Sequence, residues 1–393
     1  FVPSVAGDLM KVFLVAGELS GDRLGGALMD GLRHLVPDVQ FAGVGGPLMA
    51  AQGLKSLFSM DELSVMGIAE VLPKYRHLVK RMHQTAEAAL AWQPDVIVTI
   101  DSPDFCLRVV REVKAKCDLR CVHYVAPSVW AWRPKRAKKM AKHVDQVLAL
   151  LPFEPPYMED VGLRCDFVGH PVVAEPQASQ AEIAQFRSEF GLGDAPFVLA
   201  LPGSRRSEVQ KLAPVFGESL VAFQKSNPKM RVVVPAAAAV ASLVRENLQD
   251  WPSDAIVVDP GDFEPETAQA HKRAAFAAAD LALAASGTVS LELAAASTPM
   301  VIAYKFQWLT WRIMKAVALI DTVTLVNLVT CSRFVPECLG PECTPEKIVS
   351  ALTKVADDPS DQKKAMALTM SQLGRGGEAP GLRAARAVLD RLP

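Results

Sequence analysis

Short apolar runs alternate with longer amphipathic segments along almost the whole chain, and this alternation restricts the possible folds more than any other feature. The runs KVFLVAG (11–17), DVIVTID (95–101), RCVHYVA (120–126) and QVLALLP (146–152) each precede a segment with helical periodicity. Strands that alternate with helices form a parallel sheet with helices on both faces. The pattern therefore predicts an α/β fold.

A second series of apolar runs follows a break near HPVVAEPQASQ (170–180). Its predicted strands are FVLALPGS, RVVVPAA, AIVVDP, LALAAS and MVIAYK. A chain of 393 residues is longer than a typical single domain. We predict two α/β domains joined around residues 172–182, with the functional site beyond the carboxyl ends of the strands, in the crevice between them.

Composition excludes several other classes of protein. The net charge of −1 and the pI near 6.7 provide no basic field for nucleic acid. The seven cysteines form no C-x-x-C pair, which indicates a reducing compartment and disfavours a zinc site at Cys338 and Cys343. Residues 1–9 look like an extension without the features of a signal peptide. No apolar stretch reaches the length of a membrane-spanning helix, because Asp280 interrupts the longest one.

Two strand-end loops in the first half are candidates for substrate binding. In AGELSGD (16–22), glycines and Ser20 lead from a strand into a helix, and such a loop lets a ligand approach the backbone, although glycine-rich loops are often only structural. In VTIDSPDF (98–105), Asp101 follows a buried strand and Asp104 comes three residues later. Either carboxylate can act as a general base or cap the next helix.

Two loops in the second half have the character of a phosphate site. LALPGSRRSEV (199–209) ends a strand with Gly203 and Ser204, followed by paired arginines where a helix would ordinarily begin with acids. Ser286-Gly287-Thr288 makes a similar break, and Glu292 lies four residues further on the same helical face. A charge in such an apolar segment needs a partner, and the hydroxyls of a ribose would provide one.

Other stretches suggest a ligand wall and a membrane surface. HYVAPSVWAWRPKRAKK (123–139) places two tryptophans in a loop, which indicates either a ligand wall or a packed hinge. AEVLPKYRHLVKRM (69–82) has an apolar stripe and a basic opposite face, as either an interfacial helix or an ordinary surface helix does. YKFQWLTWRIMKAV (304–317) suits a bilayer or a homodimer equally. The predicted membrane contacts are Val71, Leu72, Tyr75, Leu78 and Val79.

Eight ordered motifs together resemble the lipid-A-disaccharide synthase family. They are VAGELSGD, VMGIAEVLP, IDSPDF, HYVAPSVWAWR, LPFE, FVGHP, LPGSR and SGTVSLE, and the resemblance covers residues 11 to 350 or so. It implies an inverting glycosyltransferase of the GT-B type, with two facing Rossmann-like domains and the active site in the cleft. The implied domains are an acceptor and membrane-facing domain, 10–175 with a return at 362–393, and a UDP-sugar-binding domain, 176–361.

The same resemblance implies the reaction. The donor would be UDP-2,3-diacylglucosamine and the acceptor 2,3-diacylglucosamine 1-phosphate, giving a β-1,6-linked disaccharide phosphate and UDP. The enzyme would work without a metal or other cofactor, in the cytoplasm, bound peripherally to the inner face of the inner membrane of a Gram-negative bacterium.

Residue roles carried over from the family follow the motifs. Asp101 would deprotonate the acceptor hydroxyl, Arg205 would lie near the diphosphate and Glu292 would bind ribose. Asn327 would face the cleft, although Val326 stands where the family usually has proline. The expected catalytic residues are Asp101 and Arg205, and the expected substrate-binding residues are Glu18, Ser20, Gly21, Ser128, Gly203, Ser204, Ser286, Gly287, Thr288, Glu292 and Asn327.

Two rival functions share many of these features. A UDP-sugar 2-epimerase has the same fold and a ribose-binding acid but needs no surface for acyl chains. A nucleotide-binding module that docks to membranes would carry out no chemistry, and its function would survive Asp101→Asn.

Overall fold

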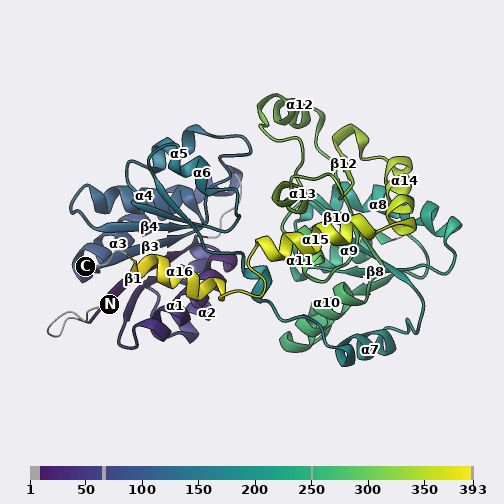
Figure 1. Ribbon diagram of the computed structural model, residues 1–393, viewed down its shortest axis with the longest axis horizontal. Coiled ribbons are helices and arrows are strands. Elements are labelled where there is room, and N and C mark those ends of the chain that lie inside the picture. Colours follow the sequence, from purple (N-terminus) through teal and green to yellow (C-terminus); the bar gives the residue numbers. More distant parts are fainter. Residues whose placement is uncertain (1–8, 64–67, 249–250, 391–393) are drawn as a thin grey trace. The chain divides into compact units, whose positions relative to one another are not determined.

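The computed structural model describes residues 9–63, 68–248 and 251–390, and the side chains of residues 68–74 and 309 are outside this description. The chain forms two compact units (Figure 1). The first contains the residues up to Ala174 together with those from Gly376 onward, and the second is Glu175–Arg375. Each unit has its own sheet and its own hydrophobic core.

The sheet of the first unit has six parallel strands in the order β2-β1-β3-β4-β5-β6. The central strands are almost wholly buried and rich in valine and isoleucine, as expected for strands covered on both faces. The bounds are β1 Lys11–Ala16, β2 Gln40–Val44, β3 Val96–Ile100, β4 Arg120–Tyr124, β5 Gln146–Ala149 and β6 Arg164–Phe167.

Two separate cores lie on the two faces of this sheet. One contains side chains of α1, α2 and α16, and the other contains side chains of α3, α4, α5 and α6. Helix α16 comes from the C-terminal end of the chain, yet it packs on α1 (Figure 1). The bounds are α1 Leu19–Leu35, α2 Pro47–Ala51, α3 Ile68–Trp92, α4 Pro103–Lys114, α5 Lys135–Met140, α6 Pro155–Glu159 and α16 Pro380–Leu389.

The second unit repeats the architecture with a sheet of order β12-β11-β10-β7-β8-β9, again parallel throughout. Its strands are β7 Phe197–Leu201, β8 Arg231–Pro235, β9 Ile256–Val258, β10 Leu281–Ala285, β11 Met300–Tyr304 and β12 Glu337–Leu339. Its helices are α7 Gln180–Glu189, α8 Arg206–Ser226, α9 Ala241–Glu246, α10 Pro265–Ala278, α11 Val289–Ala295, α12 Trp308–Val317, α13 Leu325–Thr330, α14 Pro345–Asp357 and α15 Ser360–Gln372.

The predicted α/β class with two parallel sheets is confirmed. Strands β2, β6 and β12 were not predicted, because these edge strands are short and carry polar residues that interrupt the apolar pattern. The return to the first unit was predicted near residue 362. In the structure it begins at Gly376, because α15 still packs against α11 and α13 of the second unit.

Candidate functional site

Asp101 lies at the carboxyl end of β3, in a backbone conformation that few residues adopt. Its φ is 53°, that of Ser102 is 40°, and Val125 at the end of the neighbouring strand β4 has a φ of 84°. Positive φ is rare outside glycine and costs most for a β-branched residue such as valine. Backbone strain of this kind clusters at functional sites, so the paired ends of β3 and β4 are a candidate site.

A cavity of about 220 Å³ lies at these strand ends. The Asp101 carboxylate also contacts the glycine-rich loop, because Ser20 Oγ lies 3.3 Å from Asp101 Oδ2. Its other oxygen, Oδ1, accepts a hydrogen bond of 2.8 Å from the Ser102 backbone N–H. The cavity is lined by Asp101, Pro103, Val125, Ala126, Pro127, Ser128, Trp132, Arg133 and Arg136.

Two glycines of the first loop serve close packing. A Cβ on Gly17 would lie 2.5 Å from Ser102 Oγ, so glycine lets the Asp101 loop approach the end of β1. Gly21 is buried, and a Cβ there would lie 3.4 Å from Ile100 O, so this glycine packs α1 against β3.

Glu18 is half-buried at the start of α1 and does not line the cavity. Among the residues predicted in this loop, Ser20 is the one that the structure brings to Asp101.

The tryptophan loop has one buried anchor and one exposed ring. Trp130 is buried, packs edge-to-face on Phe153, and donates from Nε1 to Glu154 Oε1 at 3.2 Å. Glu154 is only 4% exposed, and its other oxygen accepts from the Leu151 N–H at 3.0 Å. Burial raises the pKa of Glu154 to about 7. Trp132, which is 39% exposed, lines the cavity instead, so the loop supplies both a packed anchor and part of the cavity wall.

His123 is a core residue of β4. Its side chain is buried, and Nδ1 lies 2.8 Å from Thr99 Oγ1. Burial, assisted by the charge of Arg136, lowers the pKa of His123 to about 4. The imidazole is therefore neutral at pH 7. It is buried and does not line the cavity, so Asp101 is the better candidate for a base there.

The second unit contains a larger cavity, of about 640 Å³, at the carboxyl ends of its strands. Both predicted phosphate loops line it, and so does Glu292 from α11. The structure thus brings together residues that are more than 80 positions apart in the sequence. The predicted residues that line the cavity are Gly203, Ser204, Arg205, Ser286, Gly287, Thr288 and Glu292.

Glu208 occupies part of the predicted phosphate site and was not predicted. Its Oε2 accepts from the backbone N–H groups of Ser204 and Arg205 at 3.2 and 3.3 Å, and Oε1 lies 3.2 Å from Arg205 NH1. Gly203, with a φ of 116°, leaves room for this carboxylate, because a Cβ there would lie 2.6 Å from it. An acid three residues after the N-cap residue, here Arg205, is the acidic half of a capping box, and that spacing could have identified Glu208.

Glu292 has a partner within the protein. Lys272 of α10 places its Nζ 2.5 Å from Glu292 Oε2, and the same ammonium lies 5.6 Å from the centre of the Phe276 ring. Both charged residues line the cavity. Lys272 was not predicted, because its pairing with Glu292 joins two helices that the sequence separates by a strand.

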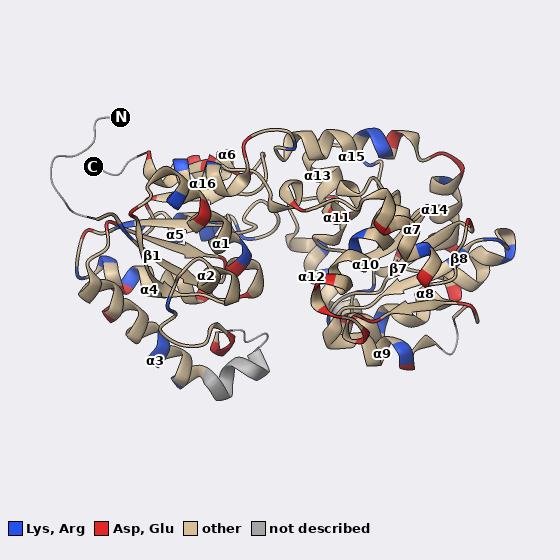
Figure 2. Cartoon of the chain, turned by 90° about the horizontal axis from the view of Figure 1, so that it is seen from below, with Lys and Arg blue, Asp and Glu red and all other residues tan. Residues whose placement is uncertain are grey.

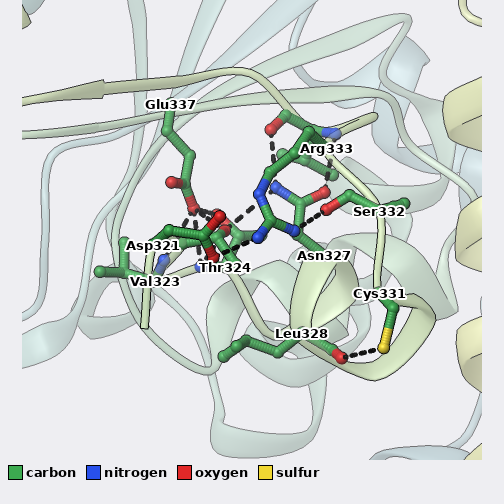
Figure 3. Close-up of polar contacts among 11 residues, drawn as sticks. Asp321, Val323, Thr324, Asn327, Leu328, Cys331, Ser332, Arg333 and Glu337 are labelled. Carbon is green, nitrogen blue, oxygen red and sulfur yellow. Dashed lines mark hydrogen bonds and ion pairs between the residues drawn. The ribbon is translucent and has the colours of Figure 1, made fainter. Parts of the chain in front are cut away.

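Asn327 of α13 was predicted to face the cleft and to contact a substrate. It is fully buried, and its amide bonds both backbone groups of Val335, at 2.9 and 3.0 Å. Figure 3 shows Asn327 among the polar residues of this segment, with Thr324, Ser332 and Glu337. Nδ2 also donates to Thr322 Oγ1 at 3.3 Å. These bonds tie α13 to the loop that leads into β12, so the side chain has a structural role. The predicted contact between Asn327 and a substrate is corrected accordingly.

The predicted membrane segment is described only in part. In α3, Tyr75 is 49% exposed, whereas Leu78 and Val79 are half-buried. The side chains of Val71 and Leu72 lie outside the described residues. In α12, Trp308 is 68% exposed and Ile313 is also exposed. Acidic and basic residues are interspersed over both units (Figure 2).

The part of the chain that the structure describes contains no helix with the length and apolar character needed to span a membrane.

The family model and the curated relatives agree on one family. The family model described as lipid-A-disaccharide synthetase matches residues 12–380. The lipid-A-disaccharide synthase of Ruegeria pomeroyi is 66% identical over 388 residues, which cover 99% of this chain and 97% of that protein.

Solved structures share the fold at low sequence identity. The glycosyltransferase of kitacinnamycin superposes with a TM-score of 0.65 at 15% identity, covering 98% of this chain and 100% of its own. The UDP-GlcNAc 2-epimerase of Neisseria meningitidis superposes with a TM-score of 0.62 at 13% identity, covering 98% and 99%. A fold shared by a transferase and an epimerase does not select between their reactions.

Proposed function

The chain belongs to the lipid-A-disaccharide synthase family, and from this premise we propose how its two cavities divide the reaction between them. It is a glycosyltransferase that forms the lipid A disaccharide. In the proposed reaction, 2,3-diacylglucosamine passes from UDP-2,3-diacylglucosamine to the 6-hydroxyl of 2,3-diacylglucosamine 1-phosphate. The products are the β-1,6-linked disaccharide 1-phosphate and UDP.

The larger cavity would hold the UDP part of the donor. Its volume of about 640 Å³ lies within the range of roughly 300–1,000 Å³ that is usual for ligand sites. Backbone groups around Gly203 and Ser286-Gly287-Thr288 would donate to the diphosphate, with the guanidinium of Arg205 as the counter-charge. Glu292 would accept hydrogen bonds from the ribose hydroxyls, held in position by Lys272.

The departing diphosphate gains negative charge in the transition state. Hydrogen-bond donors that point toward this developing charge stabilise the transition state more than the ground state, and the difference lowers the barrier. Arg205 now pairs with Glu208, so binding of the diphosphate would exchange that carboxylate for a phosphate oxygen. The same exchange would free the N–H groups of Ser204 and Arg205.

The smaller cavity would receive the acceptor sugar, with Asp101 as the general base. The carboxylate is held by the Ser102 N–H at one oxygen, and the other faces Ser20 at 3.3 Å. An acceptor hydroxyl that displaced Ser20 Oγ would lie within hydrogen-bond reach of Oδ2. Removal of its proton as the new bond to the sugar carbon forms is ordinary general-base chemistry.

Acyl chains on both substrates require contact with a lipid surface. We propose that the protein binds the cytoplasmic face of the inner membrane peripherally, with Tyr75, Leu78 and Val79 of α3 among the contacts. The exposed Tyr75 and the flanking Arg76 and Lys80 suit an interface with anionic lipid. Loss of co-sedimentation with anionic vesicles in a Tyr75→Glu/Leu78→Glu variant would support this contact, and unchanged co-sedimentation would refute it.

The observation that carries the proposed reaction is the strained, cavity-lining Asp101 in a member of this family. The test is release of UDP in detergent with and without the acceptor, with the lipid product identified by mass. We expect acceptor-dependent release and a disaccharide phosphate.

Asp101→Asn should lower kcat by about 10²- to 10⁴-fold, because general-base catalysis typically contributes that much. UDP affinity should be unchanged. Asp118→Asn, an exposed aspartate of the same unit, is the matched control and should retain full activity. Acceptor-independent release, or full activity of Asp101→Asn, would contradict the proposal.

A further inference from the structure

Arg133 lines the cavity beside Asp101 with a guanidinium that has no polar partner among the described residues, and we propose that it binds the anomeric phosphate of the acceptor. This inference rests on the proposed function, which makes a sugar 1-phosphate the acceptor. It assigns the residue that recognises the phosphate and thereby selects the phosphorylated acceptor.

The environment of Arg133 differs from that of its basic neighbours. Its guanidinium carbon lies 3.7 Å from the centre of the Trp132 ring, so the side chain is stacked on an aromatic face and pre-oriented. Arg136, the other arginine of the cavity, forms an ion pair of 2.6 Å with Asp104. Stacking leaves the N–H edge of a guanidinium free for bidentate bonds to a phosphate. Arg133 is therefore the cation of this cavity that is available to an anionic ligand.

The cavity matches a charged sugar headgroup in size and in chemistry. Its volume of about 220 Å³ is below the roughly 300–1,000 Å³ of drug-sized sites, so it suits a headgroup and not acyl chains. Asp101 is the one carboxylate among its lining residues, and Ser128 adds a hydroxyl. A lining with a base and an uncompensated cation favours a ligand that has both a reacting hydroxyl and an anionic group.

The acceptor has these two groups on one sugar, attached through the two carbons that flank the ring oxygen. Its reacting hydroxyl is on C6 and its phosphate is on C1, so an arginine that holds the phosphate also fixes the direction of the hydroxyl. Binding of the phosphate would orient the hydroxyl toward Asp101, and orientation of reacting groups contributes to rate as well as to affinity. The donor also carries phosphate groups, in its diphosphate. The experiment distinguishes binding of Arg133 to the acceptor phosphate from binding of Arg133 to the donor diphosphate.

The experiment compares two acceptors, 2,3-diacylglucosamine 1-phosphate and its dephosphorylated form, in neutral detergent micelles. In Arg133→Gln we expect kcat/KM for the phosphorylated acceptor to fall about 10- to 100-fold, as for the loss of a charge-assisted hydrogen-bonded pair. Turnover of the dephosphorylated acceptor and the KM for the donor should be unchanged. Arg133→Lys should restore part of the preference, because it keeps the charge but loses the fork geometry.

Lys138→Gln is the matched control, since it removes an exposed positive charge from the adjacent helix α5 without touching the cavity. Calorimetric unfolding of each variant reports that the first unit, which contains Arg133, is folded. Equal losses on both acceptors would overturn the inference, and so would a raised donor KM, which would assign Arg133 to the diphosphate. If the wild type itself released no UDP in response to acceptor, the proposed function would fail instead.

Discussion

Glu154 is a carboxylate that the fold keeps in an apolar environment. Burial raises its pKa from 4.5 to about 7, although the N–H groups of Leu151 and Trp130 oppose the shift. The folded protein therefore holds a proton that the unfolded chain has already lost, and this contribution to the free energy of unfolding decreases as pH rises from 4.5 to 7. At higher pH the burial of Glu154 costs roughly 3 kcal/mol.

We expect Glu154→Gln to remove this pH dependence. Buried His123 and half-buried His170, whose pKa values are lowered to about 4, act in the opposite direction, because their contribution is lost as pH falls from 6.5 to 4. The measurement is therefore the difference in unfolding free energy between variant and wild type, by urea denaturation at several pH values. Relative to that of the wild type, the unfolding free energy of Glu154→Gln should rise by roughly 3 kcal/mol between pH 4.5 and pH 8. A constant difference would contradict the assignment.

At the second cavity, Glu292 is expected to recognise the ribose. Its loss in Glu292→Ala should weaken UDP binding about tenfold, in line with roughly 1.5 kcal/mol for hydrogen bonds to a charged group. Binding of 2′-deoxy-UDP should weaken much less, because one hydroxyl is already absent. Calorimetric titration of both nucleotides checks this, with Glu218→Ala on α8, outside the cavity, as the control. Equal weakening for both nucleotides would argue against ribose recognition.

At the scale of elements, the packing of α16 on α1 depends on two glycines. A Cβ on Gly381 would lie 2.5 Å from Ala27 O, and one on Gly31 would lie 2.7 Å from Gly381 O. Both contacts are with backbone atoms, which cannot rotate away. Gly381→Val should therefore separate the helices and lower the unfolding free energy by about 1–3 kcal/mol. Arg386→Ala, on the exposed side of α16, should change it by less than about 1 kcal/mol. Similar losses in chemical denaturation for both variants would contradict this account.

At the scale of the whole molecule, the first unit is completed by the last segment of the chain. Removing the residues from Gly376 onward would expose the α1 face that contains Leu28 and Leu32, both fully buried in the intact chain. We expect this truncation to unfold the first unit and to leave UDP binding by Glu175–Arg375 intact. Calorimetry should then show a single transition that UDP shifts upward. Loss of UDP binding would indicate that the second unit does not fold independently.

The site residues that sequence reasoning identified share one property. Asp101 and the Ser286-Gly287-Thr288 loop directly follow buried strands, and Arg205 lies in the short loop after the buried strand β7. In a parallel sheet the carboxyl ends of the strands meet at one edge, so the order of the elements brings such loops together. The sequence by itself therefore determined the fold class, the family, and which loops lie at the carboxyl ends of the strands in each unit.

Tertiary structure alone decided the contacts between side chains that come from separate elements. Lys272 of α10 forms an ion pair with Glu292 of α11. Glu154 accepts a hydrogen bond from Trp130 of a different loop, and the buried Asn327 amide donates one to the Val335 carbonyl. The sequence does not encode these locally, because the direction of each side chain depends on how neighbouring elements pack. A buried polar group must find its partner wherever that packing places one, and only the assembled fold shows where that is.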